Sequence, residues 1–204
     1  MKRLKAVIGT TNAKKELELR TRLAELPLDL LPYPKGVTPA PEQGASFREN
    51  AIAKALHLAR ATGHPAIAED SGIEVDALGG RPGVFSARYA GPDATDEENN
   101  IKLLRELEGV PDDKRTARYR CVIVLADRDG ALVEADGTVE GLIARKPRGH
   151  HGFGYDPLFI YPSAKGTFGE LGPKVKEKVS HRAKALEEFI PKVADFLKSL
   201  PEED

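Results

Sequence analysis

The stretch AIAEDSGIEVD, residues Ala66–Asp76, decides how the fold of this chain is interpreted. Residues 66–68 are apolar, as in a short buried strand, and residues 73–76 alternate apolar and acidic side chains, as in a second strand. Glu69 and Asp70 lie between these two predicted strands. Because neighbouring carboxylates repel each other and lose hydration in a fold, the pair indicates a bound cation or a proton-transfer role. The alternative is a solvated acidic hairpin turn, for which Asp-Ser-Gly is ordinary chemistry.

The composition of the 204-residue chain is that of a globular protein with a substantial core. Hydrophobic residues make up 40% of the chain and charged residues 31%, which argues against disorder. No apolar run reaches the roughly 18 residues of a membrane span, and the apolar run near the N-terminus is too short for a signal peptide. Cys121 is the only cysteine, so no disulfide can form within one chain. We therefore expect one large domain, or two small lobes that share a core, in the cytoplasm.

The charges are distributed unevenly along the chain. The net charge of −1 excludes a generally basic nucleic-acid-binding protein. Residues 38–99 contain ten acids against five Lys and Arg, whereas residues 141–182 contain eight Lys and Arg against three acids. One region could hold a cation and the other an anion, and a polyphosphate with a divalent metal would satisfy both.

The N-terminal residues indicate a phosphate site. A strand over residues 5–10 leads through small polar residues into a helix that opens with Lys14 and Lys15 and extends to about residue 26. Free backbone N–H groups and the positive end of a helix dipole attract oxyanions. The spacing is neither G-x-x-x-x-G-K-[ST] nor G-x-G-x-x-G. The alternative is that a Thr or Asn side chain simply caps the helix.

A proline-rich loop over residues 27–41, with a short strand at residues 28–31, precedes the second predicted helix. Ser46 and Glu49 have the spacing of a capping box, which predicts a helix over residues 47–61. Glu42 lies in the loop just before this helix, where it is either a solvated acid or a metal ligand directed toward Asp70.

The C-terminal half combines further helices and strands with a loop suited to a planar ligand. Residues 93–108 are predicted to be helical, and residues 116–127 and 131–143 to form a hairpin whose first strand is central. The glycine-rich aromatic loop at residues 148–157 suits a planar base, or else is a surface loop with a buried aromatic anchor. Adjacent His150 and His151 point apart on an extended chain, and we therefore predict no zinc site there.

The last predicted helix begins at Ser180 and carries two cationic residues in its first turn. His181 and Arg182 oppose the helix dipole, which favours acids at that position. Their placement indicates an anionic or carbonyl-bearing ligand. Pro191 should kink the helix, because it lacks the N–H that would bond the carbonyl of Glu187.

Four ordered motifs together resemble the inosine triphosphate pyrophosphatase (Ham1) family. They are Thr10-x-Asn12-x-x-Lys15; Glu42-x-Gly44 with Glu49-Asn50-Ala51; Glu69-Asp70-Ser71-Gly72; and Phe153-Gly154-Tyr155-Asp156 with Ser180-His181-Arg182. The similarity extends nearly end to end and includes residues 77–80 and 86–89. Several ordered motifs in one chain are more specific than any one of them.

The resemblance implies an α/β fold, a long mixed central sheet flanked by helices, with residues 1–204 forming a single domain of two lobes and a cleft between them. It implies hydrolysis of the purine nucleoside triphosphates ITP, dITP and XTP to the monophosphate and pyrophosphate, which cleanses the nucleotide pool. The resemblance also implies Mg²⁺ as cofactor and a homodimer, with a small-molecule nucleotide as the other partner rather than nucleic acid or a membrane.

The resemblance also implies the residues of the site. The phosphates would be bound by Thr10, Thr11, Asn12, Ala13, Lys14 and Lys15. Asp70 would accept a proton from water, Glu42 and Asp70 would hold Mg²⁺, and Ser71 would contact the substrate. Lys15 and Lys54 would stabilise charge on the leaving pyrophosphate. The base would be met by Phe153, Gly154, Tyr155, Asp156, Lys176, His181 and Arg182.

Two departures from the family pattern leave assignments open. Thr11 stands where the family usually has glycine and Lys14 precedes Lys15, so either lysine could contact phosphate. Lys174 and Lys178 flank Lys176 in the same segment. Two other classes of function are kept as alternatives: a nucleotide- or RNA-binding module that uses residues 145–182 without catalysis, and a metal-dependent phosphatase that releases single phosphates.

Overall fold

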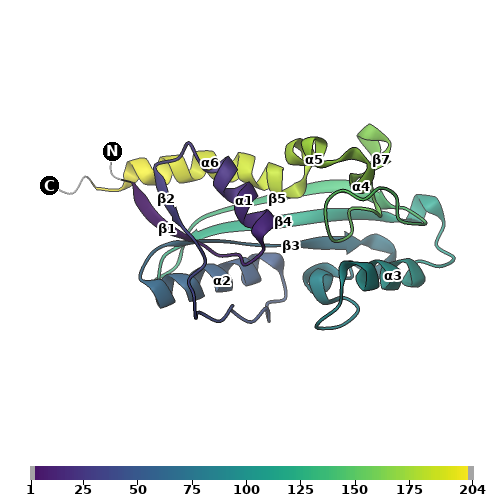
Figure 1. Cartoon of the computed structure of the whole chain (residues 1–204), viewed down its shortest axis with the longest axis horizontal. Helices are drawn as coiled ribbons and strands as arrows, with labels where there is room; N and C mark the ends of the chain where they lie inside the picture. The colour runs from purple at the N-terminus through teal and green to yellow at the C-terminus, as the bar shows by residue number, and fades with distance from the viewer. Residues whose placement is uncertain (1–2, 202–204) are drawn as a thin grey trace. The chain divides into compact units, whose positions relative to one another are not determined.

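The computed structural model of the chain describes residues 3–201, and its seven strands form one sheet in the order β2-β1-β3-β4-β5-β6-β7 (Figure 1). The strands are β1 Leu4–Ile8, β2 Leu28–Leu31, β3 Ala66–Val75, β4 Thr116–Ala126, β5 Ala131–Ile143, β6 Phe159–Tyr161 and β7 Gly166–Thr167. β1 pairs in parallel with β2 and β3, whereas β6 pairs antiparallel with β5 and β7. The predicted long mixed sheet is confirmed.

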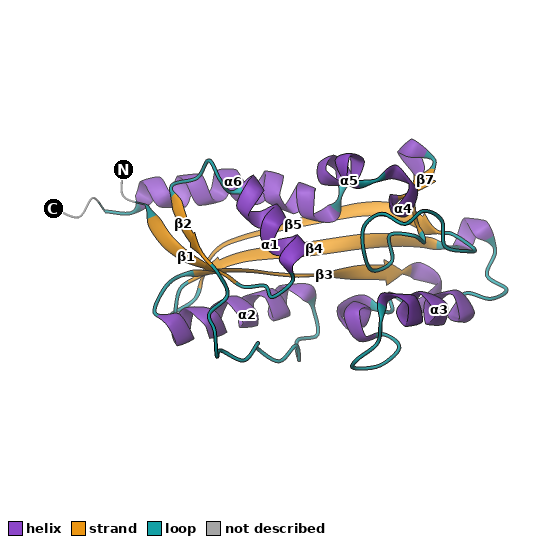
Figure 2. Ribbon diagram, in the orientation of Figure 1, coloured by secondary structure: helices purple, strands orange, loops and turns teal. Residues whose placement is uncertain are grey.

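Helices flank this sheet, as expected (Figure 2). The α-helices are α1 Ala13–Arg22, α2 Phe47–Thr62, α3 Asp96–Glu106, α4 Phe168–Leu171, α5 Pro173–Val179 and α6 His181–Ser199. Short 3₁₀ turns lie at Asp76–Leu78, Gly83–Arg88, Asp112–Lys114 and Pro162–Ala164. None of the helices within residues 3–201 is both long and apolar enough to cross a membrane.

The central acidic stretch is one strand and not two. β3 extends without interruption over residues 66–75, so the prediction of two strands joined through the carboxylates is wrong, as is the alternative of an acidic hairpin turn. Glu69 is 3% exposed and Asp70 is 6% exposed in the middle of the strand. Because successive side chains on a strand point to opposite faces, the two carboxylates are directed apart and contact different lysines.

The chain divides into two compact units, each with its own hydrophobic core. The first unit comprises residues up to 70 together with residues 122–136 and those from 185 onward; the second comprises residues 71–121 and 137–184. In the first unit, α2 packs through Leu58 and Ala59 on Val7 of β1 and Ala66 of β3. The predicted single domain of two lobes with a cleft remains a prediction.

In the second unit, α3 covers the sheet and an aromatic group fills the core. Leu103 of α3 and its C-cap residue Leu107 pack with Ile73 and Val75 of β3. The rings of Tyr119, Phe159 and Phe168 lie in the same cluster, with centroids 4.7–6.3 Å apart. The contact between aromatic rings adds to the free energy gained by burying their surface.

Several element boundaries differ from the predictions for local reasons. α3 begins three residues later than predicted, because Thr95 and Glu98 form a full capping box in front of it. α1 ends at Arg22 and not near residue 26, with Leu23 as its C-cap. The predicted α2 start is confirmed: the Ser46 side chain accepts from Glu49 N–H, while the Glu49 carboxylate accepts from Ala45 N–H.

The β4–β5 hairpin and the start of α6 follow the sequence closely. Asp127 Oδ1 accepts from the N–H groups of Asp129 and Gly130, which closes the predicted turn. The apolar run at residues 122–125 is buried, as expected for a central strand. Ser180 caps α6 through a bond from Ala183 N–H, and Pro191 lies inside the helix. The short elements α4, α5, β6 and β7 were not predicted from the sequence.

Tyr89 in the second unit gives a testable pH dependence of stability. Burial, followed by the hydrogen bond from its hydroxyl to Glu106 Oε2 at 2.7 Å, raises the pKa of Tyr89 to about 12. A raised pKa in the folded state leaves stability intact below the unfolded pKa of about 10 and removes it as the pH rises from there to about 12. We expect the melting temperature of the wild type to fall more steeply over this interval than that of Tyr89→Phe. Parallel pH profiles of the two proteins would contradict the assignment.

Candidate active site

The first unit contains a partly buried cluster of acids and lysines around Asp70, which we call the carboxylate cluster. Its members are Lys15, Glu42, Asn50, Lys54, Glu69 and Asp70. Lys54 Nζ lies 2.7 Å from Asp70 Oδ1 and 2.5 Å from Glu42 Oε1. Lys15 Nζ lies 2.9 Å from Glu69 Oε1. The predicted approach of Glu42 to Asp70 is therefore observed, with an ammonium group bridging the two carboxylates.

Asp70 is held on both of its carboxylate oxygens. Oδ1 receives Lys54 Nζ, and Oδ2 accepts a hydrogen bond from Asn50 Nδ2 at 3.1 Å. Burial raises the pKa of Asp70 above its usual value, because it outweighs the opposing effects of Lys54 and Asn50. For Lys54, burial works to lower the pKa, but Asp70 and Glu42 raise it overall. Lys54 is therefore a charged ammonium group that partly neutralises the two acids.

Asn50 connects the loop that carries Glu42 to Asp70. Its side chain is 1% exposed, and its Oδ1 accepts from Gly44 N–H at 2.8 Å while its Nδ2 donates to Asp70. Because Oδ1 is occupied by a donor, the amide orientation that directs Nδ2 toward Asp70 is fixed. A Cβ at Gly44 would lie 2.7 Å from Asn50 Oδ1, so only glycine lets the loop approach this closely. Asn50 and Lys54 are one helical turn apart on α2, which directs both toward β3.

The donor set of this cluster fits a magnesium ion that is shared with phosphate. Mg²⁺ is usually bound through one or two carboxylates, several waters and phosphate oxygens rather than by an all-protein cage. Within residues 3–201 no group of three or more His, Cys, Asp or Glu side chains is arranged to hold a metal. Glu42 and Asp70 supply two carboxylates that contact the same Lys54 ammonium group. Two protein carboxylates fall within the one or two that a magnesium ion shared with phosphate usually has.

The N-terminal motif forms a helix cap. Asn12 Oδ1 accepts from the N–H groups of Lys14 and Lys15, and Thr10 Oγ1 accepts from Asn12 N–H. The capping alternative is therefore confirmed, and Asn12 bonds the N–H groups that a phosphate would otherwise approach. Thr11 and Ala13 lie in the same turn, and Lys15 is directed to Glu69. Which of Lys14 and Lys15 contacts phosphate stays a prediction.

The second unit contains another buried polar group, which we call the Asp156 cluster: Tyr119, Phe153, Asp156, Lys176 and His181. Asp156 is fully buried and accepts from Phe153 N–H at 2.9 Å, from Tyr119 Oη at 3.3 Å and from Lys176 Nζ. The Tyr119 ring stacks on His181 with centroids 4.7 Å apart. Burial raises the pKa of the Tyr119 hydroxyl well above its ordinary value, so this group is a neutral donor.

The aromatic loop over residues 153–156 is fixed in place by contacts from α3 and from the 3₁₀ turn at Gly83–Arg88. Gly154 N–H donates to Asp96 Oδ2 at 2.6 Å, and Gly154 carbonyl accepts from Asn100 Nδ2 at 3.0 Å. Tyr155 Oη donates to the Ser86 carbonyl at 2.7 Å. The loop is therefore preorganised, and Tyr155 is a buried anchor with 4% exposure.

Helix α5 separates the three candidate lysines. Lys176 Nζ lies 4.2 Å from the centre of the Phe153 ring and bonds Asp156, whereas Lys174 and Lys178 are exposed. A helix turns successive side chains by about 100°, so only one lysine of the alternating set faces the loop. Lys176 thus contacts the aromatic loop, and its contact with the base stays a prediction.

The side chains of His181 and Arg182, which begin α6, are buried rather than solvated. His181 is 3% exposed and Arg182 is 1% exposed, and Arg182 Nη2 reaches Ser71 Oγ at 3.5 Å. Ser71, the residue after Asp70, is thus in contact with the start of α6 within the second unit. Ser71, Lys176, His181, Arg182 and the aromatic loop all belong to the second unit, and their contacts with a substrate stay a prediction.

Sequence reasoning missed several residues that organise these clusters. Asn50 stood in a quoted motif but was given no role, and Tyr119, Asp96 and Asn100 were not considered. The role of Asn50 could have been inferred from its spacing to Lys54, because residues four positions apart on a helix lie on the same face. No local pattern identified the others, because their partners are 37 to 58 residues distant in the chain.

The fold and these clusters define an α/β protein with a partly buried carboxylate–lysine centre. Residues 6–192 match the model of the Ham1 family. A protein from Desulforamulus reducens named dITP/XTP pyrophosphatase is 49% identical over 185 residues, which cover 90% of this chain and 92% of that protein. The chain belongs to the Ham1 family.

Solved structures agree with this assignment. A HAM1 protein from Coxiella burnetii superposes with a TM-score of 0.87 at 42% identity, covering 97% of this chain and all of the other. The Ham1 protein of Staphylococcus aureus superposes with a TM-score of 0.84 at 35% identity, covering 95% and 98% respectively.

Proposed function

We propose that this protein hydrolyses the purine nucleoside triphosphates dITP, XTP and ITP to the nucleoside monophosphate and pyrophosphate, which removes them from the nucleotide pool. The observation that carries the proposal is Asp70, a buried carboxylate fixed by Lys54 and Asn50 in a chain that is 49% identical to a named dITP/XTP pyrophosphatase.

Asp70 is proposed to orient the attacking water and to take its proton. Burial raises the pKa of Asp70, and this moves the pKa toward the near-neutral value that suits a general base. Lys15 and Lys54 supply positive charge that stabilises the leaving pyrophosphate. The turn from Thr10 to Lys14 would contact phosphate oxygens once its N–H groups are released from Asn12.

Glu42 and Asp70 are proposed to hold Mg²⁺, with phosphate oxygens and water completing the shell. When bound, the ion neutralises phosphate charge and lowers the pKa of a coordinated water. The ammonium group of Lys54, which lies at the same carboxylates, would then be available to the phosphates.

The second unit is proposed to recognise the base. Phe153 offers an aromatic face, and Lys176, His181 and Arg182 offer donors for the 6-keto oxygen of hypoxanthine or xanthine, with Gly154, Tyr155 and Asp156 holding the loop. Adenine carries an amino group at that position, and its N–H donors would meet the N–H donors of the protein. Such mispairing costs about 1–3 kcal/mol. This corresponds to roughly 10- to 100-fold selection per contact.

Ser71 would contact the substrate beside Asp70. A homodimer and a cytoplasmic location complete the proposal on the family resemblance.

One assay separates the proposal from its alternatives. Purified protein is incubated with Mg²⁺ and dITP, XTP, ITP, ATP or GTP, and pyrophosphate and orthophosphate are quantified separately. We expect pyrophosphate from the first three nucleotides, a rate at least tenfold lower with ATP, whose base carries an amino group at position 6, and no product after chelation with EDTA. GTP keeps the 6-keto group, so its rate relative to ITP measures discrimination at position 2. Orthophosphate as the first product would indicate the phosphatase alternative, and tight binding without turnover would indicate a binding module.

Asn50→Leu tests whether Asn50 positions Asp70. The variant loses the donor to Asp70 and the acceptor for Gly44 N–H, so we expect kcat to fall at least tenfold, a loss of about 1.4 kcal/mol of transition-state stabilisation. Asn99→Leu is the matched control: Asn99 is 2% exposed and bonds Ala90 N–H and the Ala87 carbonyl, far from Asp70 in sequence. Both variants should melt earlier, but only the first should lose kcat. Equal kcat values in two folded variants would remove Asn50 from the mechanism.

A further inference from the structure

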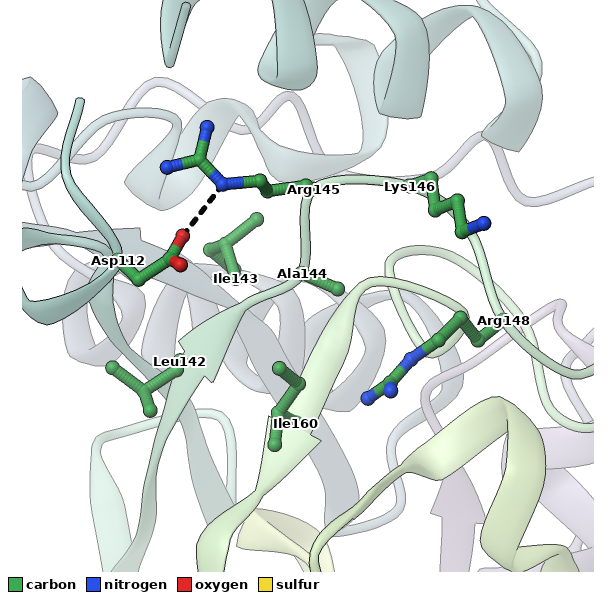
Figure 3. A pocket seen from close by; sticks show the side chains of 8 residues that line it. All are labelled: Asp112, Leu142, Ile143, Ala144, Arg145, Lys146, Arg148 and Ile160. Carbon is green, nitrogen blue, oxygen red and sulfur yellow. Dashed lines mark hydrogen bonds and ion pairs between the residues drawn. The ribbon is translucent and has the colours of Figure 1, made fainter. Parts of the chain in front are cut away.

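The second unit has a pocket of about 260 Å³ that none of the proposed nucleotide contacts uses (Figure 3). We call it the basic pocket, and its lining residues are Asp112, Leu142, Ile143, Ala144, Arg145, Lys146, Arg148 and Ile160. Three of these side chains are cationic and one is acidic. The pocket lies at the end of β5, where Leu142 and Ile160 form a cross-strand pair with β6.

The floor of the pocket is apolar and its rim is cationic. Figure 3 shows Arg145 reaching toward Asp112 and Arg148 reaching toward Ile160, while Lys146 extends the other way. Arg145 Nε lies 2.7 Å from Asp112 Oδ1, an exposed contact, so this pair is screened by solvent and exchanges readily with other anions.

Arg148 is a preorganised donor. Its N–H donates to the Pro157 carbonyl at 2.9 Å and its carbonyl accepts from Thr167 Oγ1 at 2.7 Å, so the backbone is fixed on both sides. Its Nε is buried and makes no hydrogen bond, although Glu170 Oε2 lies 3.5 Å away. A buried donor without a hydrogen bond is unfavourable unless an acceptor arrives.

A further cation lies behind the floor. Arg115 is 3% exposed, and its guanidinium donates to the carbonyls of Leu107, Ile143 and Ala144, of which the last two residues line the pocket. Burial lowers the pKa of Arg115, and the charge of Arg145 lowers it further. The cations therefore repel one another, and a bound anion would relieve this repulsion.

From these contacts we propose that the basic pocket is a binding site for a small phosphate-bearing anion, separate from the carboxylate cluster. The volume suits inorganic phosphate, pyrophosphate or a small phosphate monoester rather than a drug-sized ligand, whose pockets begin at about 300 Å³. Arg145 and Arg148 present planar guanidinium groups, which pair with phosphate oxygens through two parallel hydrogen bonds. An organic phosphate would in addition place its apolar part on Leu142 and Ile160.

The test is a titration of the ¹⁵N-labelled full chain, without added divalent metal, with sodium phosphate, sodium pyrophosphate or inosine monophosphate, followed by NMR. We expect saturable shifts of the backbone amides of Ala144, Arg145, Arg148 and Ile160, and none with sodium chloride at equal ionic strength. Tighter binding of inosine monophosphate would identify an organic phosphate as the ligand, and equal binding would identify the phosphate group itself. Absence of saturable shifts with all three anions would overturn the proposal.

Three variants test both the direction and the size of the expected changes in affinity. Arg145→Ala/Arg148→Ala should weaken the affinity at least tenfold, whereas Arg105→Ala/Arg128→Ala, which removes two exposed cations elsewhere, should leave it unchanged. Asp112→Asn should tighten it several-fold, because it removes the acid and releases Arg145. Equal effects of the two arginine double variants would indicate general charge attraction and would refute a specific site. If Arg145→Ala/Arg148→Ala is unstable, Asp112→Asn still tests the proposal. Weaker or unchanged anion binding by Asp112→Asn would contradict it.

Discussion

Asp70→Asn is expected to lower the turnover of dITP or XTP at least 100-fold at saturating Mg²⁺ while the protein stays folded. The amide that replaces the carboxylate cannot accept a proton, and removal of a positioned base typically costs 10²- to 10⁴-fold. Of its two oxygen positions one becomes an NH₂ group, which faces either Lys54 or Asn50, donor against donor. Turnover is measured as initial pyrophosphate release, and folding as the melting temperature.

The exposed carboxylate of Asp195 on α6 provides the control. Asp195→Asn removes a charge from a surface pair with Lys198, so both turnover and melting temperature should match the wild type. Metal affinity, measured by calorimetry with Mg²⁺ or Mn²⁺, separates the two roles proposed for Asp70: a loss of turnover that persists at saturating metal belongs to proton transfer. A folded Asp70→Asn protein with near-normal turnover would remove Asp70 from the chemistry and with it the proposed mechanism.

Asp156→Ala is expected to give the largest loss of stability among single substitutions near the proposed base site. The substitution leaves Lys176, the Phe153 N–H and the Tyr119 hydroxyl without their common acceptor. Breaking a buried ion pair by deleting one partner costs about 3–5 kcal/mol. For a chain of this length that is a fall in melting temperature of roughly 6–20 °C. Because the aromatic loop loses its anchor, the KM for dITP should rise as well.

A second substitution shows whether the unpaired charge is the cause. Asp156→Asn/Lys176→Met removes both charges and keeps an acceptor for the Phe153 N–H, so it should recover a substantial part of the lost stability. Its KM should stay high, because Lys176 is proposed to contact the base. The surface substitution Asp195→Ala should change the melting temperature by little. A melting temperature of Asp156→Ala equal to that of Asp195→Ala would contradict the structural role of Asp156.

The sequence alone predicted the elements whose patterns are local. The capping residues Ser46 and Ser180, the helix-to-strand change of periodicity and the turn at residues 128–130 each depend on neighbours a few positions away. The motifs also sufficed to identify the family, since four ordered motifs are rarely shared by chance. The short elements from β6 to α5 escaped prediction because a strand of two or three residues has no detectable period.

The long central strand shows where local reasoning fails. A Ser-Gly step after two acids has turn chemistry, yet residues 66–75 form one strand, because the burial of Ile67, Ile73 and Val75 outweighs the local turn preference. This outcome reverses the meaning of the acidic pair. The carboxylates of Glu69 and Asp70 point to opposite faces of the strand, where they contact Lys15 and Lys54 respectively.

By itself, then, the amino-acid sequence determined the secondary-structure pattern, the family and the types of residue that the site needs. Only the tertiary structure decided which side chains meet: Lys15 at Glu69, Lys176 at Asp156, and Asn50 as the link to Asp70. The reason is physical. Propensity and periodicity act over one or two turns of chain, whereas these contacts join residues 20 to 54 positions apart, and only the packing of helices onto the sheet brings such residues together.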